Sequence, residues 1–171
     1  IEIVRMLLDT GINPNSQSEG ESPLSDAIFY GDLAIIKALI AAGADPDERI
    51  NLEGYSHLTI AISSQEVEIA KILLDAGAVL NGQVALGALH SALSNNNIEM
   101  AKILLDAGVN PNNKLYEDDH PLLFGAIDRG NVEIVDILLK AGANPNEKID
   151  GRSYLIYATH YGNIEIMKML L

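Results

Sequence analysis

The segment from Asn131 to Asn146, NVEIVDILLKAGANPN, has the pattern of an apolar helix that ends at a glycine and is followed by a proline. Related segments recur as IEIVRMLLDTGINPN, DLAIIKALIAAGADPD, EVEIAKILLDAGAVLN and NIEMAKILLDAGVNPN, with a truncated copy, NIEIMKMLL, at the end. Their closing glycines lie 31 to 34 residues apart, at Gly11, Gly43, Gly77, Gly108 and Gly142. A fixed period in this range is typical of stacked structural repeats.

A shorter apolar segment precedes five of these helices, at residues 22–31, 56–65, 87–96, 121–130 and 153–162. Each repeat is therefore predicted to be a helix pair, with a short first helix and an apolar second helix. One such pair cannot bury its apolar surface alone, so neighbouring pairs must stack.

The second helix of each pair is predicted to be buried on two sides. In the copy that begins at Asn131, the apolar residues cover far more than one narrow stripe of a helix: Val132, Ile134, Val135, Ile137, Leu138 and Leu139. Gly142 supplies a left-handed residue at the helix end, and Pro145 prevents the helix from continuing.

The residue between the two helices of a pair is also predicted to be left-handed. It is glycine in three copies, at Gly31, Gly130 and Gly162. Asn96 tolerates this backbone geometry, whereas Gln65 is expected to adopt it at a cost in free energy.

The first helices share a six-residue pattern with leucine in third place and alanine in sixth. The copies read Ser22-Pro23-Leu24-Ser25-Asp26-Ala27, Ser56-His57-Leu58-Thr59-Ile60-Ala61, Gly87-Ala88-Leu89-His90-Ser91-Ala92, Pro121-Leu122-Leu123-Phe124-Gly125-Ala126 and Ser153-Tyr154-Leu155-Ile156-Tyr157-Ala158. This pattern is similar to the T-P-L-H-x-A motif of the ankyrin repeat. The run from Leu138-Leu139 to Gly142-Ala143-Asn144-Pro145-Asn146 also resembles the end of that repeat, and the resemblance covers the whole chain.

The resemblance implies an all-α fold: an ankyrin-repeat α-solenoid of stacked antiparallel helix pairs with projecting finger loops. It implies a single ankyrin-repeat domain over residues 1–171, with partial repeats at 1–15 and 147–171. The full repeats are then expected at 16–47, 48–81, 82–112 and 113–146. The finger loops are expected at 16–21, 48–55, 82–86, 113–120 and 147–152.

The resemblance also implies that a partner binds on the concave side, formed by the fingers and the first helices. An exposed pair is expected near the end of each first helix: Phe29-Tyr30, Ser63-Ser64, Ser94-Asn95, Asp128-Arg129 and His160-Tyr161. The fingers are expected to add Glu19, Glu21, Glu53, Tyr55, Tyr116, Glu117 and Asp118 to the partner-binding residues.

Aromatic residues favour the same side. All eight lie in first helices or fingers, and none lies in a second helix. Exposed Tyr and Phe are good interface anchors, and Phe29-Tyr30 is the pair that we expect to matter most. The alternative is that slim aliphatic side chains simply suit the crowded second helices and that several of these rings belong to the core.

The chain carries a formal net charge of −13, and its finger segments contain nine acidic against four basic residues. This charge disfavours nucleic acid and favours a protein or peptide with a basic or apolar contact surface. The alternative is that the acidic residues only keep a repeat protein in solution.

The sequence contains no recognisable catalytic motif and no cysteine, so we predict neither an enzyme nor a cofactor. The resemblance implies a structural role for His90, whose ring would bond neighbouring backbone. His57 is expected at the surface at the start of a first helix, and His160 beside a partner. His120, after Asp118 and Asp119, is a weak candidate for a metal ligand.

The predicted function is a non-catalytic scaffold for protein–protein interaction, monomeric and by default cytoplasmic. No apolar run approaches the roughly 18–20 residues that span a bilayer, so no membrane contact is expected. One alternative is a partner-recruitment domain of a larger enzyme, channel or effector, because the chain begins within a repeat at Ile1 and we expect the natural protein to extend at both ends. The other is a metal-dependent hydrolase that uses Asp118, Asp119 and His120.

Overall fold

The computed structural model describes residues 1–18, 21–48, 56–116 and 120–171. The chain divides into two compact units, Ile1–Asn81 and Gly82–Leu171, each built of short helices. In the described part of the chain, the only sheet is one pair of two-residue strands.

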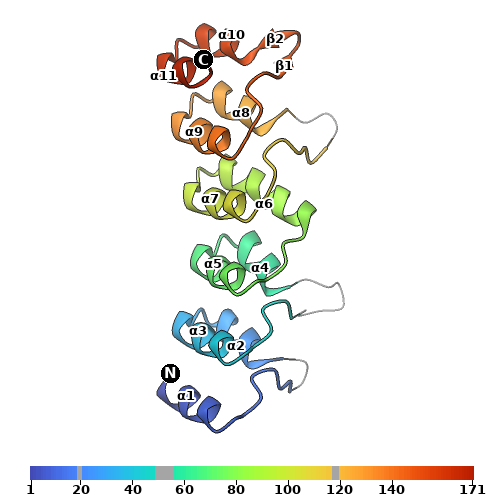
Figure 1. Cartoon of the computed structure of the whole chain (residues 1–171), viewed down its shortest axis with the longest axis vertical. Helices are drawn as coiled ribbons and strands as arrows, with labels where there is room; N and C mark the ends of the chain where they lie inside the picture. Colours follow the sequence, from blue (N-terminus) through green and yellow to red (C-terminus); the bar gives the residue numbers. More distant parts are fainter. Residues whose placement is uncertain (19–20, 49–55, 117–119) are drawn as a thin grey trace. The chain divides into compact units, whose positions relative to one another are not determined.

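The first unit contains α1 (Glu2–Asp9), α2 (Pro23–Phe29), α3 (Leu33–Ala41), α4 (His57–Ser63) and α5 (Val67–Asp75). Helix α2 packs against α3, and α4 packs against α5, so each predicted helix pair is present (Figure 1). Helix α3 also contacts both α1 and α5, which makes these three second helices one layer of the unit.

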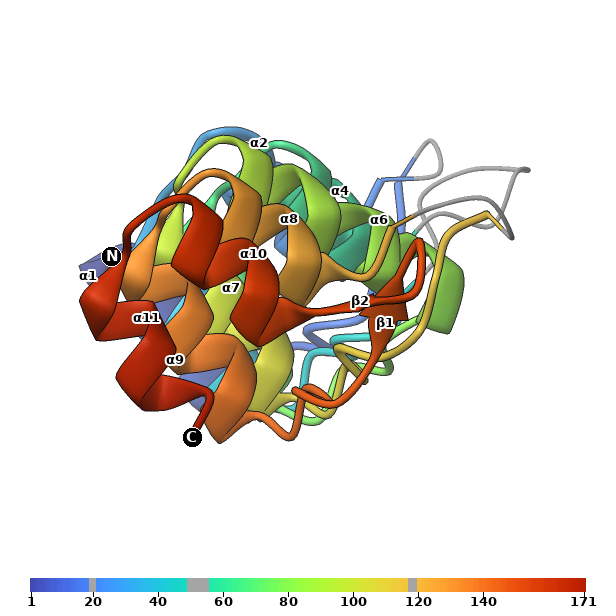
Figure 2. The same ribbon diagram turned by 90° about the horizontal axis from the view of Figure 1, so that it is seen from above.

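The second unit contains α6 (Gly82–Ser94), α7 (Ile98–Asp106), α8 (Leu122–Asp128), α9 (Val132–Lys140), α10 (Tyr154–His160) and α11 (Ile164–Met169). Second helices α7, α9 and α11 pack in series, and first helices α8 and α10 pack beside them (Figure 2). Strands β1 (Lys148–Ile149) and β2 (Arg152–Ser153) form an antiparallel hairpin. Asp150 and Gly151 turn it with φ of 51° and 77°, as a tight hairpin turn requires, so the expected finger at 147–152 is hairpin-like.

The expected finger at residues 82–86 is wrong, because α6 begins at Gly82 and runs through that segment. Ala85 and Leu86 are buried there, and residues 83–86 contain no proline or glycine that would turn the chain. Burial of this apolar face extends α6 to 13 residues, against seven in α2 and in α4, in place of a loop.

Serine starts α2 and α4 where the ankyrin motif has threonine. The Ser22 hydroxyl oxygen accepts a hydrogen bond from the backbone N–H of Ser25, and that of Ser56 accepts one from Thr59. Either residue type satisfies a free N–H at a helix N-terminus. The loss of the Thr-Pro pair therefore leaves these two helix starts intact.

Both the first and the second helices contribute buried side chains to the core. In α9, Ile134, Val135, Ile137 and Leu138 are buried, while Val132 and Leu139 are half-buried. In three second helices, α5, α7 and α9, the first leucine of the Leu-Leu pair is fully enclosed, at Leu73, Leu104 and Leu138, and the second is only half-buried, at Leu74, Leu105 and Leu139. The two leucines of a pair therefore contribute unequally to the core.

The predicted left-handed residues are confirmed. Gly31, Gly130 and Gly162 have φ between 67° and 69°, and Gln65 and Asn96 have φ of 60° and 57°. Gln65 has neither the small side chain of glycine nor the short polar side chain of asparagine, which favour this backbone conformation. It offsets part of the strain through its side-chain amide, which donates a hydrogen bond to the Ile62 carbonyl at 3.2 Å.

We expect Gln65→Gly to leave the unfolding free energy unchanged or to raise it by up to about 1 kcal/mol, because glycine adopts positive φ without steric cost. Urea denaturation followed by circular dichroism measures the change. Gly31→Ala is the matched control: a Cβ there has open space around it, so its expected loss of about 1 kcal/mol comes from the backbone alone. A clear loss in the Gln65→Gly variant would contradict the strain at this position.

Asparagine side chains join consecutive repeats. The Asn15 amide donates to the Gly43 carbonyl at 2.9 Å and accepts from the Asp45 backbone N–H at 2.8 Å. Asn112 makes the same two bonds, to Gly142 and Asn144. Asp47 holds the corresponding place and accepts from the Val79 backbone N–H at 2.7 Å, but a carboxylate has no donor for the Gly77 carbonyl.

We expect Asp47→Asn to raise the unfolding free energy by about 1 kcal/mol, because it adds the missing bond between two repeats. Thermal unfolding of the variant at neutral pH measures the gain as a higher Tm. Asn112→Asp is the reverse exchange and should lower the Tm. A loss in both variants would show that the amide donor does not stabilise this junction.

Candidate protein-interaction surface

Every predicted first-helix pair lies at the end of its helix and is exposed to solvent. In each pair the first residue is the last of its helix and the second comes directly after it. The pairs are Phe29-Tyr30 at α2 and Ser63-Ser64 at α4 in the first unit, and Ser94-Asn95 at α6, Asp128-Arg129 at α8 and His160-Tyr161 at α10 in the second unit. A left-handed residue follows each pair and ends the first helix. The pairs therefore stand at the same place in every repeat.

Phe29 and Tyr30 are by far the largest side chains in these pairs of the first unit. Phe29 is 83% exposed and Tyr30 is 79% exposed. Their ring centroids lie 5.2 Å apart with an angle of 86° between the ring planes, an edge-to-face contact. Two adjacent aromatic rings with this much exposure form an apolar surface patch of the kind that marks interaction sites.

A pocket of about 300 Å³ lies beside these two rings. Its apolar lining comes from Ile28, Phe29 and Tyr30 of the first repeat and from Ile60 of the next. Its polar lining comes from Glu21, Ser25, Asp26 and His57. The pocket is therefore formed by two adjacent first helices, α2 and α4, together with Glu21 of the preceding loop.

The expected surface position of His57 is wrong, because only 1% of this residue is exposed. Its Nε2 atom lies 2.9 Å from the Ser25 hydroxyl oxygen, across the junction between two repeats. Ser25 holds the fourth place of the motif, where the ankyrin pattern has histidine. The short serine side chain leaves room for the His57 ring of the next repeat.

Burial lowers the pKa of His57 below its ordinary value of 6.5, because an enclosed site disfavours the charged imidazolium. The carboxylates of Glu48 and Asp45 act in the opposite direction but more weakly. Glu48 itself is held by two hydrogen bonds, from the Ser22 hydroxyl and from the Gln17 amide. His57 is therefore a neutral, buried group in the wall of the pocket at neutral pH.

Two of the predicted pairs in the second unit are joined to each other. The Tyr161 hydroxyl donates a hydrogen bond to an Asp128 carboxylate oxygen at 2.6 Å, and this bond raises the pKa of Tyr161. His160 contacts the Tyr161 ring, with centroids 5.5 Å apart. This bond links the ends of α8 and α10 and holds the exposed Tyr161 ring in one orientation.

Of the expected finger residues, Glu21 lines the pocket and Tyr116 is exposed. The remaining five, Glu19, Glu53, Tyr55, Glu117 and Asp118, lie outside the described residues. The partner-binding role of all of these residues stays a prediction.

Three aromatic residues of the second unit belong to the core and its edge. This agrees with the alternative interpretation, in which several of the aromatic rings belong to the core. Phe124 packs against Tyr154 and Tyr157, with centroid distances of 6.1 Å and 4.9 Å. Burial and the nearby Glu147 carboxylate raise the pKa of the buried Tyr154 hydroxyl. Tyr157 donates to the Ile149 carbonyl at 3.2 Å and so attaches the β1–β2 hairpin to α10.

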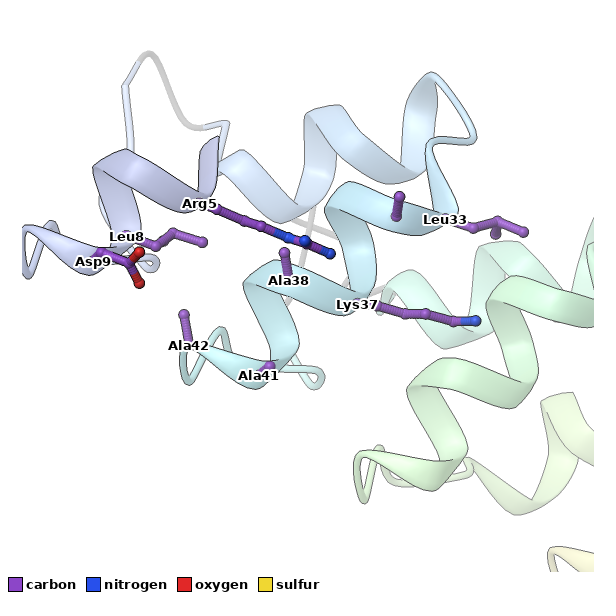
Figure 3. A pocket seen from close by; sticks show the side chains of 9 residues that line it. Arg5, Leu8, Asp9, Leu33, Lys37, Ala38, Ala41 and Ala42 are labelled. Carbon is purple, nitrogen blue, oxygen red and sulfur yellow. The ribbon is translucent and has the colours of Figure 1, made fainter. Parts of the chain in front are cut away.

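A larger groove, of about 790 Å³, lies between α1 and α3 on the second-helix side of the first unit (Figure 3). Arg5 extends from α1 toward Ala38, and much of the remaining lining is alanine. Its charged residues are of both signs, with Arg5 and Lys37 opposed by Asp9. No aromatic residue lines it, so it lacks the anchoring side chains of the smaller pocket.

The metal alternative rests on His120, whose exposed ring packs against Phe124 with centroids 5.0 Å apart. Asp118 and Asp119 lie outside the described residues, and within the described ranges no group of three His, Asp or Glu could hold a metal ion. This alternative stays a prediction, to be tested by calorimetric titration with zinc and manganese. In the described chain, no helix is long and apolar enough to cross a membrane.

The sequence predicted Phe29, Tyr30 and Glu21 but missed the rest of the pocket, in particular Ser25, Asp26 and Ile60. One signal was available, because Asp26, Phe29 and Tyr30 stand at positions i, i+3 and i+4 of one helix face. Ile60 occupies the motif position of Asp26 one repeat later. Residues at the same or neighbouring motif positions of adjacent first helices are therefore expected to lie close together in the fold.

Two family models match the chain: "Ankyrin repeats (3 copies)" over residues 48–115 and 89–171, and "Ankyrin repeat" over residues 19–51. Together these matches cover more than half of the sequence. The chain belongs to the ankyrin repeat family. Its fold is the all-α ankyrin-repeat solenoid, and the resemblance noted in the motifs is confirmed.

Curated relatives share parts of this ankyrin repeat chain. The human ankyrin repeat and MYND domain-containing protein 1 is 48% identical over 46 residues, which are 27% of this chain and 5% of the relative. An ankyrin repeat protein of fowlpox virus (strain NVSL) is 32% identical over 94 residues, 53% of this chain and 20% of the relative. The chain thus spans a fifth or less of the length of these two relatives.

Solved ankyrin repeat structures cover nearly the whole chain. A domain from Acinetobacter baumannii AYE is 28% identical, with a TM-score of 0.60, over 98% of this chain and 95% of its own. The human ASB11 domain is 26% identical, with a TM-score of 0.56, over 97% of this chain and 75% of its own. Ankyrin repeat domains are generally non-catalytic scaffolds for protein–protein interaction.

Proposed function

We propose that this ankyrin repeat domain binds a partner protein or peptide on the side formed by its first helices and the loops before them. The observation that carries the proposal is the exposed Phe29-Tyr30 pair beside the pocket between α2 and α4. Aromatic side chains of this kind bury a large area on binding and lose little rotamer entropy. Since folded helices hold both rings, little ordering of the domain is needed when the partner binds.

The partner is expected to present a basic or apolar surface. The chain has a formal net charge of −13, and Glu21 and Asp26 place two acidic side chains at the pocket itself. A phosphate backbone would be repelled by such a surface, which argues against nucleic acid. The proposed partner-binding residues are Phe29, Tyr30 and Glu21 in the first place, and the other exposed first-helix pairs are further candidates.

The test is a selection of peptides from a random phage-displayed library against the 171-residue chain, followed by isothermal titration calorimetry of the selected peptides. We expect the double variant Phe29→Ala, Tyr30→Ala to weaken binding at least tenfold, because it removes both aromatic anchors. Urea denaturation checks that the variant remains folded.

The matched control is the double variant Ile3→Ala, Met6→Ala, which also removes two large exposed apolar side chains, but from α1. It should leave the affinity unchanged. Peptides whose affinity is the same for the wild type and the Phe29, Tyr30 variant would remove this pair from the interaction site.

The finer alternative, a recruitment domain within a larger enzyme, channel or effector, stays a prediction. Determination of the full reading frame would test it. A reading frame that contains nothing but further repeats on either side would contradict it. The predicted monomeric state is tested by light scattering of the purified chain.

A further inference from the structure

We propose that the pocket between α2 and α4 receives an arginine side chain of the partner. This inference rests on the proposed function and adds to it the chemistry of one anchoring residue. Three features of the pocket carry it: its two acidic side chains, its aromatic rings and its buried neutral histidine.

The acidic side chains of the pocket are Glu21 and Asp26, and no basic residue of the described chain lines it with them. Over residues 1–18, 21–48, 56–116 and 120–171, neither carboxylate takes part in an ion pair. In the second unit, by contrast, Lys102 lies 3.6 Å from Glu133, and Lys140 lies 2.6 Å from Asp136. The pocket therefore combines two acids that have no salt bridge within the described chain with a mostly apolar wall, where a bound cation would be screened less than in open water.

The aromatic rings favour a guanidinium group over an ammonium group. Phe29 and Tyr30 are both more than three-quarters exposed and meet edge to face, which leaves ring surface open to a ligand. A guanidinium group stacks on aromatic faces and pairs with carboxylates through two parallel hydrogen bonds. The pocket volume, about 300 Å³, lies at the small end of ligand sites and suits a single side chain.

His57 is compatible with a bound cation because burial keeps its ring neutral. Its Nε2 atom is engaged with the Ser25 hydroxyl at 2.9 Å, whereas its Nδ1 atom has no hydrogen-bond partner among the described residues. A neutral imidazole carries one donor and one acceptor nitrogen. The wall of the pocket thus contains one buried polar atom, His57 Nδ1, that makes no hydrogen bond within the described chain.

The experiment uses peptides selected on the 171-residue chain and their arginine-to-citrulline and arginine-to-lysine derivatives. We expect the selected peptides to share an arginine. Citrulline has nearly the same shape without the charge, and it should weaken binding at least tenfold. Lysine keeps the charge without the planar fork, and it should be intermediate between the two.

On the protein side, the double variant Glu21→Gln, Asp26→Asn should weaken the arginine peptide at least tenfold and the citrulline peptide little. The control Glu66→Gln, Glu68→Gln removes the same charge from the exposed start of α5 in the same unit, outside the pocket. It should change the affinity less than twofold. An equal loss of affinity in both variants would indicate a general electrostatic attraction in place of a specific pocket, and it would overturn the inference.

The remaining outcomes separate this inference from the proposed function. Peptides that lose binding in the Phe29, Tyr30 variant but contain no essential arginine would overturn the arginine pocket and leave the proposed function standing. Arginine peptides that bind independently of Phe29 and Tyr30 would overturn both the aromatic anchor and the pocket. Failure to select any peptide would count against the proposed function, and with it against the pocket.

Discussion

Replacement of Leu104 by alanine is expected to lower the unfolding free energy of the second unit by about 2–5 kcal/mol. Leu104 lies on α7 and is fully enclosed. Its removal loses the transfer free energy of the buried carbon atoms and leaves a cavity, which the neighbouring helices fill only in part. Urea denaturation of the wild type and the variant, followed by circular dichroism, measures the loss.

Leu105→Ala is the matched control for Leu104→Ala, since it makes the same chemical change one position later in the same helix. Leu105 is only half-buried and lines a groove open to solvent beside Lys102 and Lys140. We expect a loss of less than half that of Leu104→Ala. Equal losses in the two variants would contradict the unequal burial of the Leu-Leu pair.

The second large effect is an acid-sensitive contribution of His57 to stability. Burial lowers the pKa of His57 in the folded state, so the unfolded chain binds a proton more readily than the folded chain. The contribution is fully present above the unfolded pKa of about 6.5 and is lost as the pH falls below it. The loss is at most about 1.4 kcal/mol per pH unit for one proton, and it continues until the folded pKa is reached.

The measurement is the unfolding free energy of the wild type and of His57→Gln between pH 8 and pH 5. Many carboxylates titrate in an acidic chain, but their effects are common to both proteins, so the difference between the two curves isolates His57. We expect wild-type stability to fall more steeply than that of His57→Gln below about pH 6.5. Parallel curves would contradict the buried, neutral state of His57.

Much of the repeat could be predicted from sequence because its signals are local. Gly31, Gln65 and Asn96 share one place in the repeat and share positive φ, since the end of the first helix demands it whatever residue is present. The apolar spacing of residues 132–139 likewise predicts two-sided burial, which the structure confirms for Ile134, Val135, Ile137 and Leu138.

The errors concern positions where a neighbouring repeat decides the outcome. Comparison with the other repeats predicts a finger at Gly82, yet burial of Ala85 and Leu86 makes the segment helical. The place of His57 at a helix start predicts a surface position. Its burial depends on Ser25 in the preceding repeat, thirty-two positions away in the chain.

The aromatic residues show the same limit. Tyr154 and Tyr161 both belong to the last first-helix segment, but Tyr154 is enclosed against Phe124 and Tyr161 is exposed and bonded to Asp128. From composition alone, such rings are expected either to anchor a partner or to pack in the core. Only the positions of adjacent helices determine which role each ring takes.

The sequence by itself determined the period, the helix pairs, the left-handed junctions and hence the ankyrin repeat family, because backbone geometry and apolar periodicity act within a single repeat. The tertiary structure decided which side chains of adjacent repeats meet, and so decided the enclosure of His57 and the pocket beside Phe29 and Tyr30. The physical reason is that burial, desolvation and hydrogen bonding across a repeat junction depend on both partners, and the period of the repeat alone does not specify how two differing copies fit together.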